Sequence, residues 1–442
     1  MTAPIPEHAM TPQTVRLYAA AIATAKIGTG FFFLINTWLI IDITGRPSSA
    51  AITLVMTILP SLLLSPIIGL AVDRGQPARL AYRAELLRWL VLIAYGALYG
   101  AGLATEAIGY AVSFCVALGN EIQVLAWRAA LARAVPPERM LRLNALTVVG
   151  GQSGQILGAA ASGIVLAAIG AVATVALAGT TYLVSAVLGF LVARRLGSQE
   201  LPAGTALRGP RRHFSDLRAG LRHIAARPEI GFFYGLILAN MTVIFGINGM
   251  LAPFVREELH LGADAFGKID AGYALGAILS GLIIVRLAKR FGHRLVLVLG
   301  FLTLAGSLFA FAQTQGLIAA LVTYVGLGLS CQTSVLSLSL AQQATGPGFQ
   351  GRVNATFNVL NGLAGLAIYG IVALSAGHHL YRQLYLAQAV LVLALVPVIL
   401  VASRRGRIGR LLRPGLDKFA EDATNATIPA QARSVLVKSS PM

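Results

Sequence analysis

The stretch 48–79 has the sequence SSAAITLVMTILPSLLLSPIIGLAVDRGQPAR. From Ser48 to Val72 it contains no charged residue and is mostly apolar. A helix needs about 20 such residues to cross the hydrocarbon core of a bilayer. Asp73, Arg74 and Arg79 then follow in a short polar connection. The stretch therefore predicts a membrane-spanning helix that ends at a charged connection.

Apolar segments of similar length recur along the rest of the chain. They lie at Arg16 to Ile41, Arg79 to Leu103, Glu106 to Leu131, Leu141 to Ile169, Ala171 to Arg194, Glu229 to Arg256, Asp264 to Lys289, His293 to Gln313, Gln315 to Ala344, Gly351 to Gly377 and His379 to Ser403. In lipid only helices and closed barrels satisfy every backbone hydrogen bond, and these segments are too continuous for barrel strands. The sequence therefore predicts an all-α membrane protein with twelve transmembrane helices.

The composition excludes several other classes of protein. Of the 442 residues 56% are hydrophobic and only 12% are charged, which leaves too little polar surface for a soluble globule. The formal net charge of +18 is divided among short clusters, so no continuous basic face for a nucleic acid is expected. Cys115 and Cys331 are the only cysteines and lie inside apolar segments, so we expect no disulfide framework, no metal site and no cofactor.

Basic residues concentrate in every second connection between the apolar segments. They are Arg74, Arg79 and Arg83; Arg128, Arg133, Arg139 and Arg142; Arg286, Lys289, Arg290 and Arg294; and Arg404, Arg405, Arg407, Arg410 and Arg413. Basic connections usually stay in the cytoplasm. Residues 1–15 lack the pattern of a cleaved signal peptide, so the first apolar segment is expected to remain as an anchor. We therefore expect an integral protein of the plasma (inner) membrane with both termini cytoplasmic.

The pattern divides the chain into five regions. They are a cytoplasmic N-terminal segment (1–15), a first six-helix bundle (16–195), a linker (196–228), a second six-helix bundle (229–403) and a basic tail expected to be disordered (404–442). In the linker, Phe214, Leu217, Leu221 and Ile224 recur at helical spacing among arginines, which is typical of an amphipathic helix on anionic inner-leaflet lipid. A cytosolic recognition helix is the alternative.

The two halves carry similar motifs at corresponding places. Arg142-Leu143-Asn144-Ala145 begins the fifth segment, and Arg352-Val353-Asn354-Ala355 begins the eleventh. The connection 69–79, after the second segment, corresponds to 287–294, after the eighth. Parallel repeats of this kind build the two bundles of one large class of transporters.

These motifs resemble the major facilitator superfamily, whose signature Gly-x-Leu-Ala-Asp-Arg-x-Gly-Arg-Arg lies between the second and third helices. Gly69, Asp73, Arg74 and Arg79 match it, whereas residues 75–78 replace its later glycine and paired arginines. In the second copy, Lys289 stands where the signature would have its acid. The resemblance implies the major facilitator fold of two pseudo-symmetric six-helix bundles.

The same resemblance implies a conformational latch formed by Gly69, Asp73, Arg74, Arg79 and Arg128. An acid near a helix end, with arginines beside it, can bind the helix ends of the other half when the cytoplasmic side is closed. The alternative is that these residues merely follow the rule for basic connections. That rule explains the arginines but not the acid.

Four further motifs resemble the branch that contains enterobactin exporters and macrolide-efflux proteins. They are RAELLR (83–88), WRAAL (127–131), DLRAGLR (216–222) and GRV (351–353). The resemblance implies secondary active export of a siderophore-like metabolite or a hydrophobic drug by alternating access with proton antiport. A proton- or ion-coupled importer on the same fold is the alternative. An enzyme is not expected, because the sequence has no recognisable catalytic constellation.

Glycines recur in the fifth segment at Gly154, Gly158 and Gly163. Together with Ala159 they resemble the glycine-rich motif of proton antiporters in this superfamily, with the alanine replacing its proline. Small residues let helix backbones pack closely, and such packing can seal the outward side in one state. The same spacing is frequent in any membrane bundle, so by itself it indicates only a packing motif.

Lys26 and Glu121 are ionisable residues deep inside apolar segments, where charges are costly and usually functional. At about 1.5 Å per residue, both lie roughly 15 Å from the cytoplasmic ends of the first and fourth helices. In this superfamily those helices line the central cavity, so we expect the two side chains to face one another, with Glu121 as the proton carrier. A static ion pair of Glu121 with Lys26 or Arg128 is the alternative. Glu85 and Asp270 lie nearer helix ends and are expected to be solvated or paired.

Polar residues on the predicted cavity helices extend the predicted substrate site. They are Asn36, Gln123, Asn240, Asn248, Tyr324 and Gln332. Some of them can instead form hydrogen bonds between helices. The expected partners are a small-molecule substrate, protons and anionic membrane lipid, and the protein is expected to be a monomer.

Overall fold

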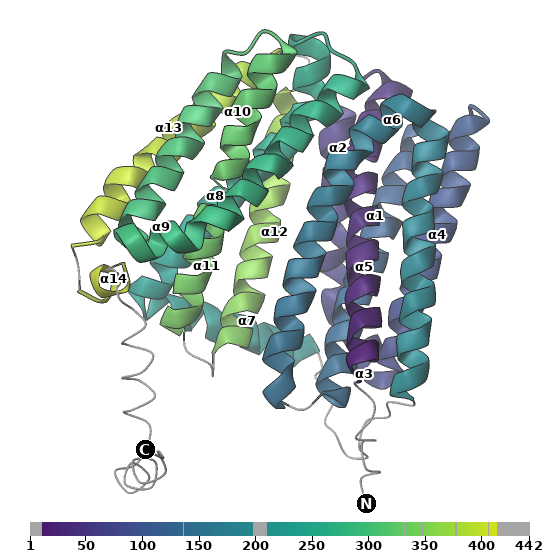
Figure 1. The fold of residues 1–442 in the computed structure, drawn as a ribbon, viewed down its shortest axis with the longest axis horizontal. Coiled ribbons are helices and arrows are strands. Elements are labelled where there is room, and N and C mark those ends of the chain that lie inside the picture. The colour runs from purple at the N-terminus through teal and green to yellow at the C-terminus, as the bar shows by residue number, and fades with distance from the viewer. Residues whose placement is uncertain are drawn as a thin grey trace, which may run out of the picture.

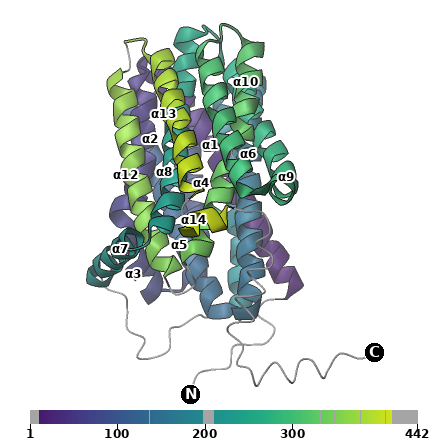
Figure 2. The ribbon, with the colours of Figure 1, turned by 90° about the vertical axis from the view of Figure 1, so that its left-hand side faces the viewer.

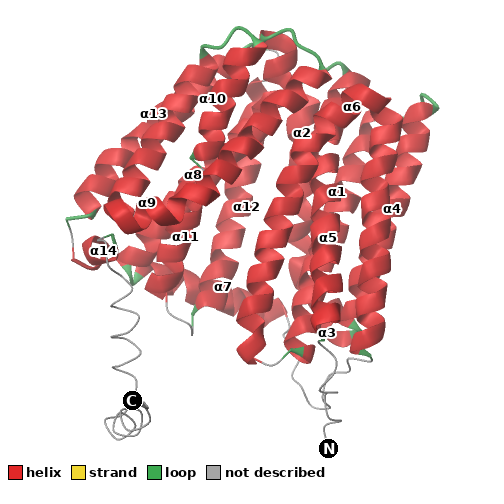
Figure 3. Cartoon of the chain, in the orientation of Figure 1, coloured by secondary structure: helices red, strands yellow, loops and turns green. Residues whose placement is uncertain are grey.

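The computed structural model describes residues 11–135, 137–197, 210–330, 332–345, 349–375, 378–404 and 406–412. In these ranges the chain is helical apart from turns and short loops, and no strand occurs (Figure 3). The all-α class expected from the sequence is confirmed.

The helices follow one another along the chain with short connections. They are α1 (Pro12–Thr44), α2 (Ser48–Leu59), η1 (Pro60–Leu64), α3 (Ser65–Arg74), α4 (Pro77–Gly100), α5 (Glu106–Ala134), α6 (Pro137–Leu196), α7 (Pro210–Ala225), α8 (Pro228–Pro253), η2 (Phe254–Glu258), α9 (Ala263–Ala312), α10 (Leu317–Leu329), α11 (Gln332–Thr345), α12 (Gln350–Ser375), α13 (Tyr381–Ala402) and α14 (Gly406–Leu411).

These helices cover every predicted transmembrane segment. The second segment comprises α2, η1 and α3, the seventh comprises α8 and η2, and the tenth comprises α10 and α11, while α6 and α9 each supply two segments. By length and composition alone, nine helices in the described ranges qualify as membrane spans. α4 is not among them and carries Glu85 and Arg88 in its middle, so its charges must be neutralised inside the protein.

α6 and α9 each contain a sharp break at a glycine. Gly170 has φ 76° and ψ 172°, and Gly292 has φ 79° and ψ 159°. This backbone region is accessible essentially to glycine alone, because a Cβ atom would clash with the neighbouring peptide. The breaks fall where the hydrophobic pattern separates the fifth segment from the sixth and the eighth from the ninth.

Replacing Gly170 with alanine is expected to lower the free energy of unfolding by about 1–3 kcal/mol. A Cβ on Gly170 would meet no other part of the protein within 4 Å, so the loss would come from strain in the local backbone and not from a clash with another helix. Thermal unfolding of the purified protein in detergent measures the change. Gly281→Ala is the matched control, because its Cβ also meets nothing but its backbone is helical. An equal loss in both variants would contradict the strain argument.

Two short π-helical segments interrupt the spans next to prolines. η1 begins at Pro60, and η2 follows Pro253. Proline cannot donate a backbone hydrogen bond, which loosens the helix where it stands. η1 lies directly before Ser65, the first residue of α3, which contacts a charged group described below.

We call the end of the molecule at which α1 begins and α3 ends the terminal face, and the opposite end the distal face (Figure 1). α7 lies across the terminal face (Figure 2). It is attached to the second half, because Thr356 Oγ1 of α12 donates to the carbonyl of Leu217 at 3.2 Å. Leu221 on α7 stays half-exposed beside the exposed Arg218 and Arg222. The linker helix is therefore amphipathic, with one side packed on α12.

The two halves share apolar core near the distal face. One buried cluster of the second half also includes Leu34, Ile40, Ile41, Ala50 and Ala51 of the first. These residues belong to the last part of α1 and the first turn of α2, which meet at the distal face. Two other buried clusters lie within the first half alone. In this conformation the halves are therefore packed together at the distal end.

Candidate substrate and coupling site

A cavity of about 230 Å³ lies inside the first half, where α1, α2, α4, α5 and α6 converge. Its lining residues are Lys26, Thr29, Phe32, Phe33, Asn36, Thr53, Leu54, Thr57, Arg88, Ser113, Val116, Ala117, Asn120 and Gln155. Cationic and polar groups thus stand among apolar side chains, an arrangement suited to binding an amphipathic small molecule. In the described ranges no three His, Cys, Asp or Glu side chains are grouped so as to hold a metal ion.

Two of the predicted site residues, Lys26 and Asn36, line this cavity. Lys26 Nζ donates to Asn120 Oδ1 at 2.8 Å, and Asn36 Nδ2 donates to Ser113 Oγ at 2.6 Å. Asn36 Oδ1 is buried and has no hydrogen-bond partner within the described part of the chain. The described ion pairs do not include Lys26. The polar lining of the cavity therefore includes the Lys26 ammonium group and the Asn36 amide.

Glu121 lies on α5 directly after Asn120, which lines the cavity, but Glu121 is not itself among the lining residues. Ser65 Oγ donates to Glu121 Oε1 at 3.3 Å. The side chain is half-buried, and the charges of Lys26 and Arg128 act on its carboxylate through space. Neither Lys26 nor Arg128 forms a described ion pair with Glu121. The static ion pair that was the alternative in the sequence analysis is therefore not formed in this conformation.

Glu85 and Arg88 form a buried charged pair on α4 that the sequence analysis did not place in the site. Arg88 Nη1 lies 3.0 Å from Glu85 Oε1, and the two side chains are 0% and 1% exposed. Arg88 Nη2 also donates to Thr29 Oγ1 at 2.8 Å and to the hydroxyl of Tyr182 at 2.6 Å. Glu85 is thus paired and not solvated. The sequence did carry a signal for this pair. Opposite charges three residues apart inside an apolar segment lie on the same side of a helix, where they can pair.

Three other residues predicted to line the cavity are either not among its lining residues or have side chains outside the described residues. Gln123 is fully buried, and neither its amide oxygen nor its amide nitrogen has a partner in the described part of the protein. Asn240 Nδ2 donates to Thr333 Oγ1 at 2.8 Å, which joins α8 to α11. The side chain of Gln332 lies outside the described residues.

Tyr324 and Asn248 also take part in packing within the second half. Tyr324 is 1% exposed, and its ring packs against Phe311, which in turn packs against Tyr385. Asn248 lies on α8 and is partly buried. The cavity therefore belongs to the first half, and Asn240, Asn248 and Tyr324 of the second half are not among its lining residues.

The glycines of α6 permit close helix contacts on two sides. A Cβ on Gly154 or Gly158 would collide with the backbone of α1. A Cβ on Gly163 would collide with the backbone of Gly267 on α9, in the other half. The structure thus assigns two of these glycines to packing within the first half and the third to the contact between halves.

An aromatic and charged contact joins the halves at the distal face. The rings of Trp38 on α1 and Phe266 on α9 are stacked with centroids 5.4 Å apart. Arg256 Nη1 lies 3.8 Å from Asp42 Oδ1, and its guanidinium lies 5.9 Å from the Trp38 ring. Among the described ion pairs this is the one that crosses between the halves. It reinforces the apolar closure of the distal end.

The predicted latch residues lie at the terminal face, away from that closure. Arg74, Arg79 and Arg128 are exposed, and no described ion pair joins them to the second half. Gly69 has open space where a Cβ would project. The side chain of Asp73 lies outside the described residues. A latch between the halves stays a prediction for another conformation.

Arg133, near the end of α5, binds the end of α3 within the first half. Its guanidinium donates to the carbonyl of Gly75 at 3.4 Å and to that of Val72 at 3.5 Å. A cation is favourable there, because the last carbonyls of a helix carry partial negative charge. This arginine therefore holds the signature connection in place.

A family model described as "Transmembrane secretion effector" matches residues 9–437, nearly the whole chain. The chain belongs to this family. Secretion effectors of this kind are transporters of the major facilitator superfamily, so the predicted fold of two six-helix bundles is confirmed. The protein is an integral membrane transporter and not an enzyme.

Two curated relatives of this secretion effector come from Bacillus subtilis (strain 168). "Uncharacterized MFS-type transporter YfmI" is 22% identical over 277 residues, which cover 62% of this chain and 67% of the relative. "Uncharacterized MFS-type transporter YddS" is 25% identical over 179 residues, which cover 39% of this chain and 41% of the relative. Both names support membership of the major facilitator superfamily. Neither name indicates which branch of the superfamily the chain belongs to.

Solved transporter structures share the fold of the secretion effector. A bacterial homologue of the iron transporter ferroportin, in an inward-facing state, has a TM-score of 0.65 at 16% identity and covers 88% of this chain and 99% of its own. A bacterial homologue of the lysosomal transporter Spinster, also inward-facing, has a TM-score of 0.61 at 13% identity and covers 91% and 98%. At such identities the likeness is one of fold alone.

Proposed function

We propose that this transporter exports a small organic molecule by alternating access, with protons moving in the opposite direction. The observation that carries the proposal is the cavity lined by Lys26 beside Glu121, inside a span that must cross lipid. Ionisable groups at such depth are costly, and they are usually retained for transport or coupling. The family description, a secretion effector, supports the outward direction.

The distribution of arginine supports an orientation with the terminal face in the cytoplasm of the plasma (inner) membrane. Exposed arginines of that face include Arg74, Arg79, Arg83, Arg128, Arg194, Arg195, Arg290, Arg294, Arg404, Arg407 and Arg410. In this orientation the packed distal ends close the outer side. The conformation is then inward-facing, the state in which an exporter takes up its substrate.

The proposed cycle uses the groups around the cavity. Substrate enters from the cytoplasm and binds near Lys26 while the Glu121 carboxylate accepts a hydrogen bond from Ser65. The halves then rock, the distal contacts open and the latch residues close the terminal face. Glu121 takes up a proton from outside as substrate leaves, and it releases that proton to the cytoplasm after the return. One proton thus enters for each substrate exported.

The volume and the lining of the cavity limit the class of substrate that it can hold. The sequence resemblance favours the enterobactin-exporter and macrolide-efflux branch, and hence a siderophore-like metabolite or a hydrophobic drug. Drug-sized ligands usually occupy pockets of about 300–1,000 Å³. At about 230 Å³ the cavity holds one end of such a molecule, with Phe32 and Phe33 supplying apolar contact and Lys26 a charge.

Glu121→Gln is expected to lower proton-driven export by about tenfold or more, because glutamine keeps the shape of the site but carries no exchangeable charge. Everted vesicles that contain the protein are energised, and a panel of siderophores and hydrophobic drugs is added. Export substrates of the wild type release protons, which a pH-sensitive dye records. Exchange of labelled substrate without a gradient is expected to persist in the variant.

Asp264→Asn is the matched control, because this carboxylate is exposed and outside the cavity. Proton-driven export that survives unchanged in Glu121→Gln would remove Glu121 from the coupling role. The same vesicles also test the alternative function, a coupled importer. A proton gradient that drives labelled solute in the cytoplasmic direction would favour the importer and overturn the proposed direction.

A further inference from the structure

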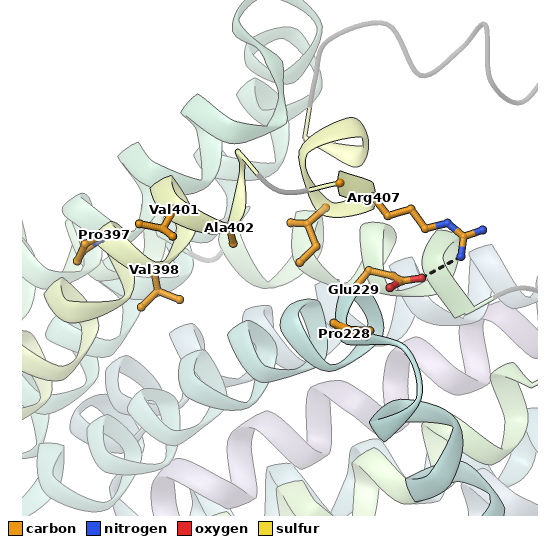
Figure 4. Close-up of a pocket in the computed structure, with 9 residues that line it drawn as sticks. Pro228, Glu229, Pro397, Val398, Val401, Ala402 and Arg407 are labelled. Atoms are coloured by element: carbon orange, nitrogen blue, oxygen red, sulfur yellow. Dashed lines mark hydrogen bonds and ion pairs between the residues drawn. The ribbon is translucent and has the colours of Figure 1, made fainter.

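A second, larger cavity lies at the terminal face of the other half. It has a volume of about 670 Å³ and opens between α8, α13 and α14 (Figure 4). Its walls are mainly apolar and include Pro397, Val398, Val401 and Ala402 of α13 and Ile408 of α14. Val398 and Val401 are half-exposed, so the groove opens toward the surroundings of the bundle. We call it the α13–α14 groove.

The groove exists because α14 folds back against the end of α13 and is fastened there. Gly409 packs against the carbonyl of Ser403 so closely that a Cβ would overlap it. At the other end of α14, the backbone N–H of Arg294 donates to the carbonyl of Leu412 at 3.2 Å. α14 is thus a fixed floor at the membrane end of α13.

Positive charge surrounds the mouth of the groove. Arg404 and Arg410 are exposed and each lies two residues along the chain from a lining residue, Ala402 and Ile408 respectively. Arg407 Nη1 lies 3.1 Å from Glu229 Oε1, and its side chain remains 65% exposed while that of Glu229 is 9% exposed (Figure 4). Glu229 is the one acid among the lining residues, so it offsets a single arginine and leaves the mouth cationic.

We propose that the α13–α14 groove binds an anionic phospholipid, with an acyl chain along the apolar wall of α13 and the phosphate at Arg404 and Arg410. The groove lies where a membrane span gives way to a basic segment, which is the depth at which acyl chains meet headgroups. Guanidinium groups bind phosphate oxygens in paired hydrogen bonds. Glu229 pairs with Arg407, so the phosphate is assigned to Arg404 and Arg410.

The test compares lipid retention by the purified full-length protein in native mass spectrometry. The probes are dioleoylphosphatidylglycerol and dioleoylphosphatidylcholine at equal concentration. The wild type is expected to retain the anionic lipid about tenfold more strongly. Arg404→Gln/Arg410→Gln, which keeps the Arg407–Glu229 pair, is expected to lose most of this preference.

Arg194→Gln/Arg195→Gln is the matched control, because it removes two exposed arginines from the terminal end of α6 in the other half. Its preference for the anionic lipid is expected to stay at the wild-type level. Val401→Trp fills the apolar wall without removing charge and is expected to reduce retention of both lipids. Equal losses in the two arginine variants, or no effect of Val401→Trp, would overturn the proposal, because either would indicate general surface attraction.

Discussion

Replacing Arg88 with methionine is expected to lower the free energy of unfolding by about 3–5 kcal/mol. Arg88 is completely buried and neutralises Glu85, which is also buried, at 3.0 Å. Without the guanidinium, Glu85 must either stay ionised in an apolar interior or take up a proton, and both cost free energy. Glu85 Oε2 already has no partner among the described groups, so no second described contact replaces the lost one. Thermal unfolding in detergent measures the loss.

The double variant Glu85→Leu/Arg88→Met separates charge from packing. Removing both charges is expected to recover most of the stability, because apolar pairs of similar volume replace buried ion pairs at little cost. Lys268→Met is the control for an exposed pair, since Lys268 and Asp264 lie 3.3 Å apart at the surface. That change is expected to cost less than about 0.5 kcal/mol. If the double variant is as unstable as Arg88→Met, the lost stability comes instead from the hydrogen bonds that Arg88 donates to Thr29 and Tyr182.

Gly163→Ala is expected to loosen the distal closure between the halves. The added Cβ would come within 2.7 Å of the backbone nitrogen of Gly267, which is closer than such atoms approach. α6 and α9 must therefore separate in the closed state, at a cost of about 1–3 kcal/mol. Because about 1.4 kcal/mol corresponds to a factor of ten, the equilibrium should shift toward the distal-open state by roughly fivefold to somewhat more than a hundredfold.

The accessibility of a cysteine at position 36 in the cavity measures this shift. Asn36→Cys is introduced after Cys115 and Cys331 have been changed to serine, and a membrane-impermeant maleimide is added on the distal side. Labelling is expected to accelerate in Gly163→Ala. It should stay at the reference rate in Gly150→Ala, because a Cβ on Gly150, on the same helix, meets nothing within 4 Å. Unchanged labelling in Gly163→Ala would show that this contact does not hold the distal end closed.

Much of the fold was predictable because it depends on local properties of the chain. The break between the fifth and sixth segments was expected beside Gly170, and the structure bends there at a backbone conformation that glycine alone accepts. Counting residues along helices likewise predicts the depth of Lys26 and Glu121 in the membrane. The π-helical segments at Pro60 and Pro253 were not anticipated, because the hydropathy pattern treats a span as one straight helix.

The candidate site was predictable only in part. Lys26 and Asn36 line the cavity, but Tyr324 was expected there and instead packs in an aromatic core. The rotation of a helix about its own axis decides between these outcomes, and a span that is apolar on all sides carries little sign of that rotation. The sequence left open whether Glu85 is solvated or paired for a related reason. The partners of Arg88 lie 59 and 94 residues away in the chain and meet only after folding.

The sequence by itself determined which segments cross the membrane, where they break and which of them carry charge. These features follow from the cost of moving each segment into lipid, which is nearly independent of the other segments. The tertiary structure alone decided which side chains meet in the cavity, and that the halves close at the distal end through Trp38, Phe266 and Gly163. In lipid, helices associate through close packing and not through hydrophobic exclusion, so their contacts depend on the shapes of surfaces that only the folded bundle brings together.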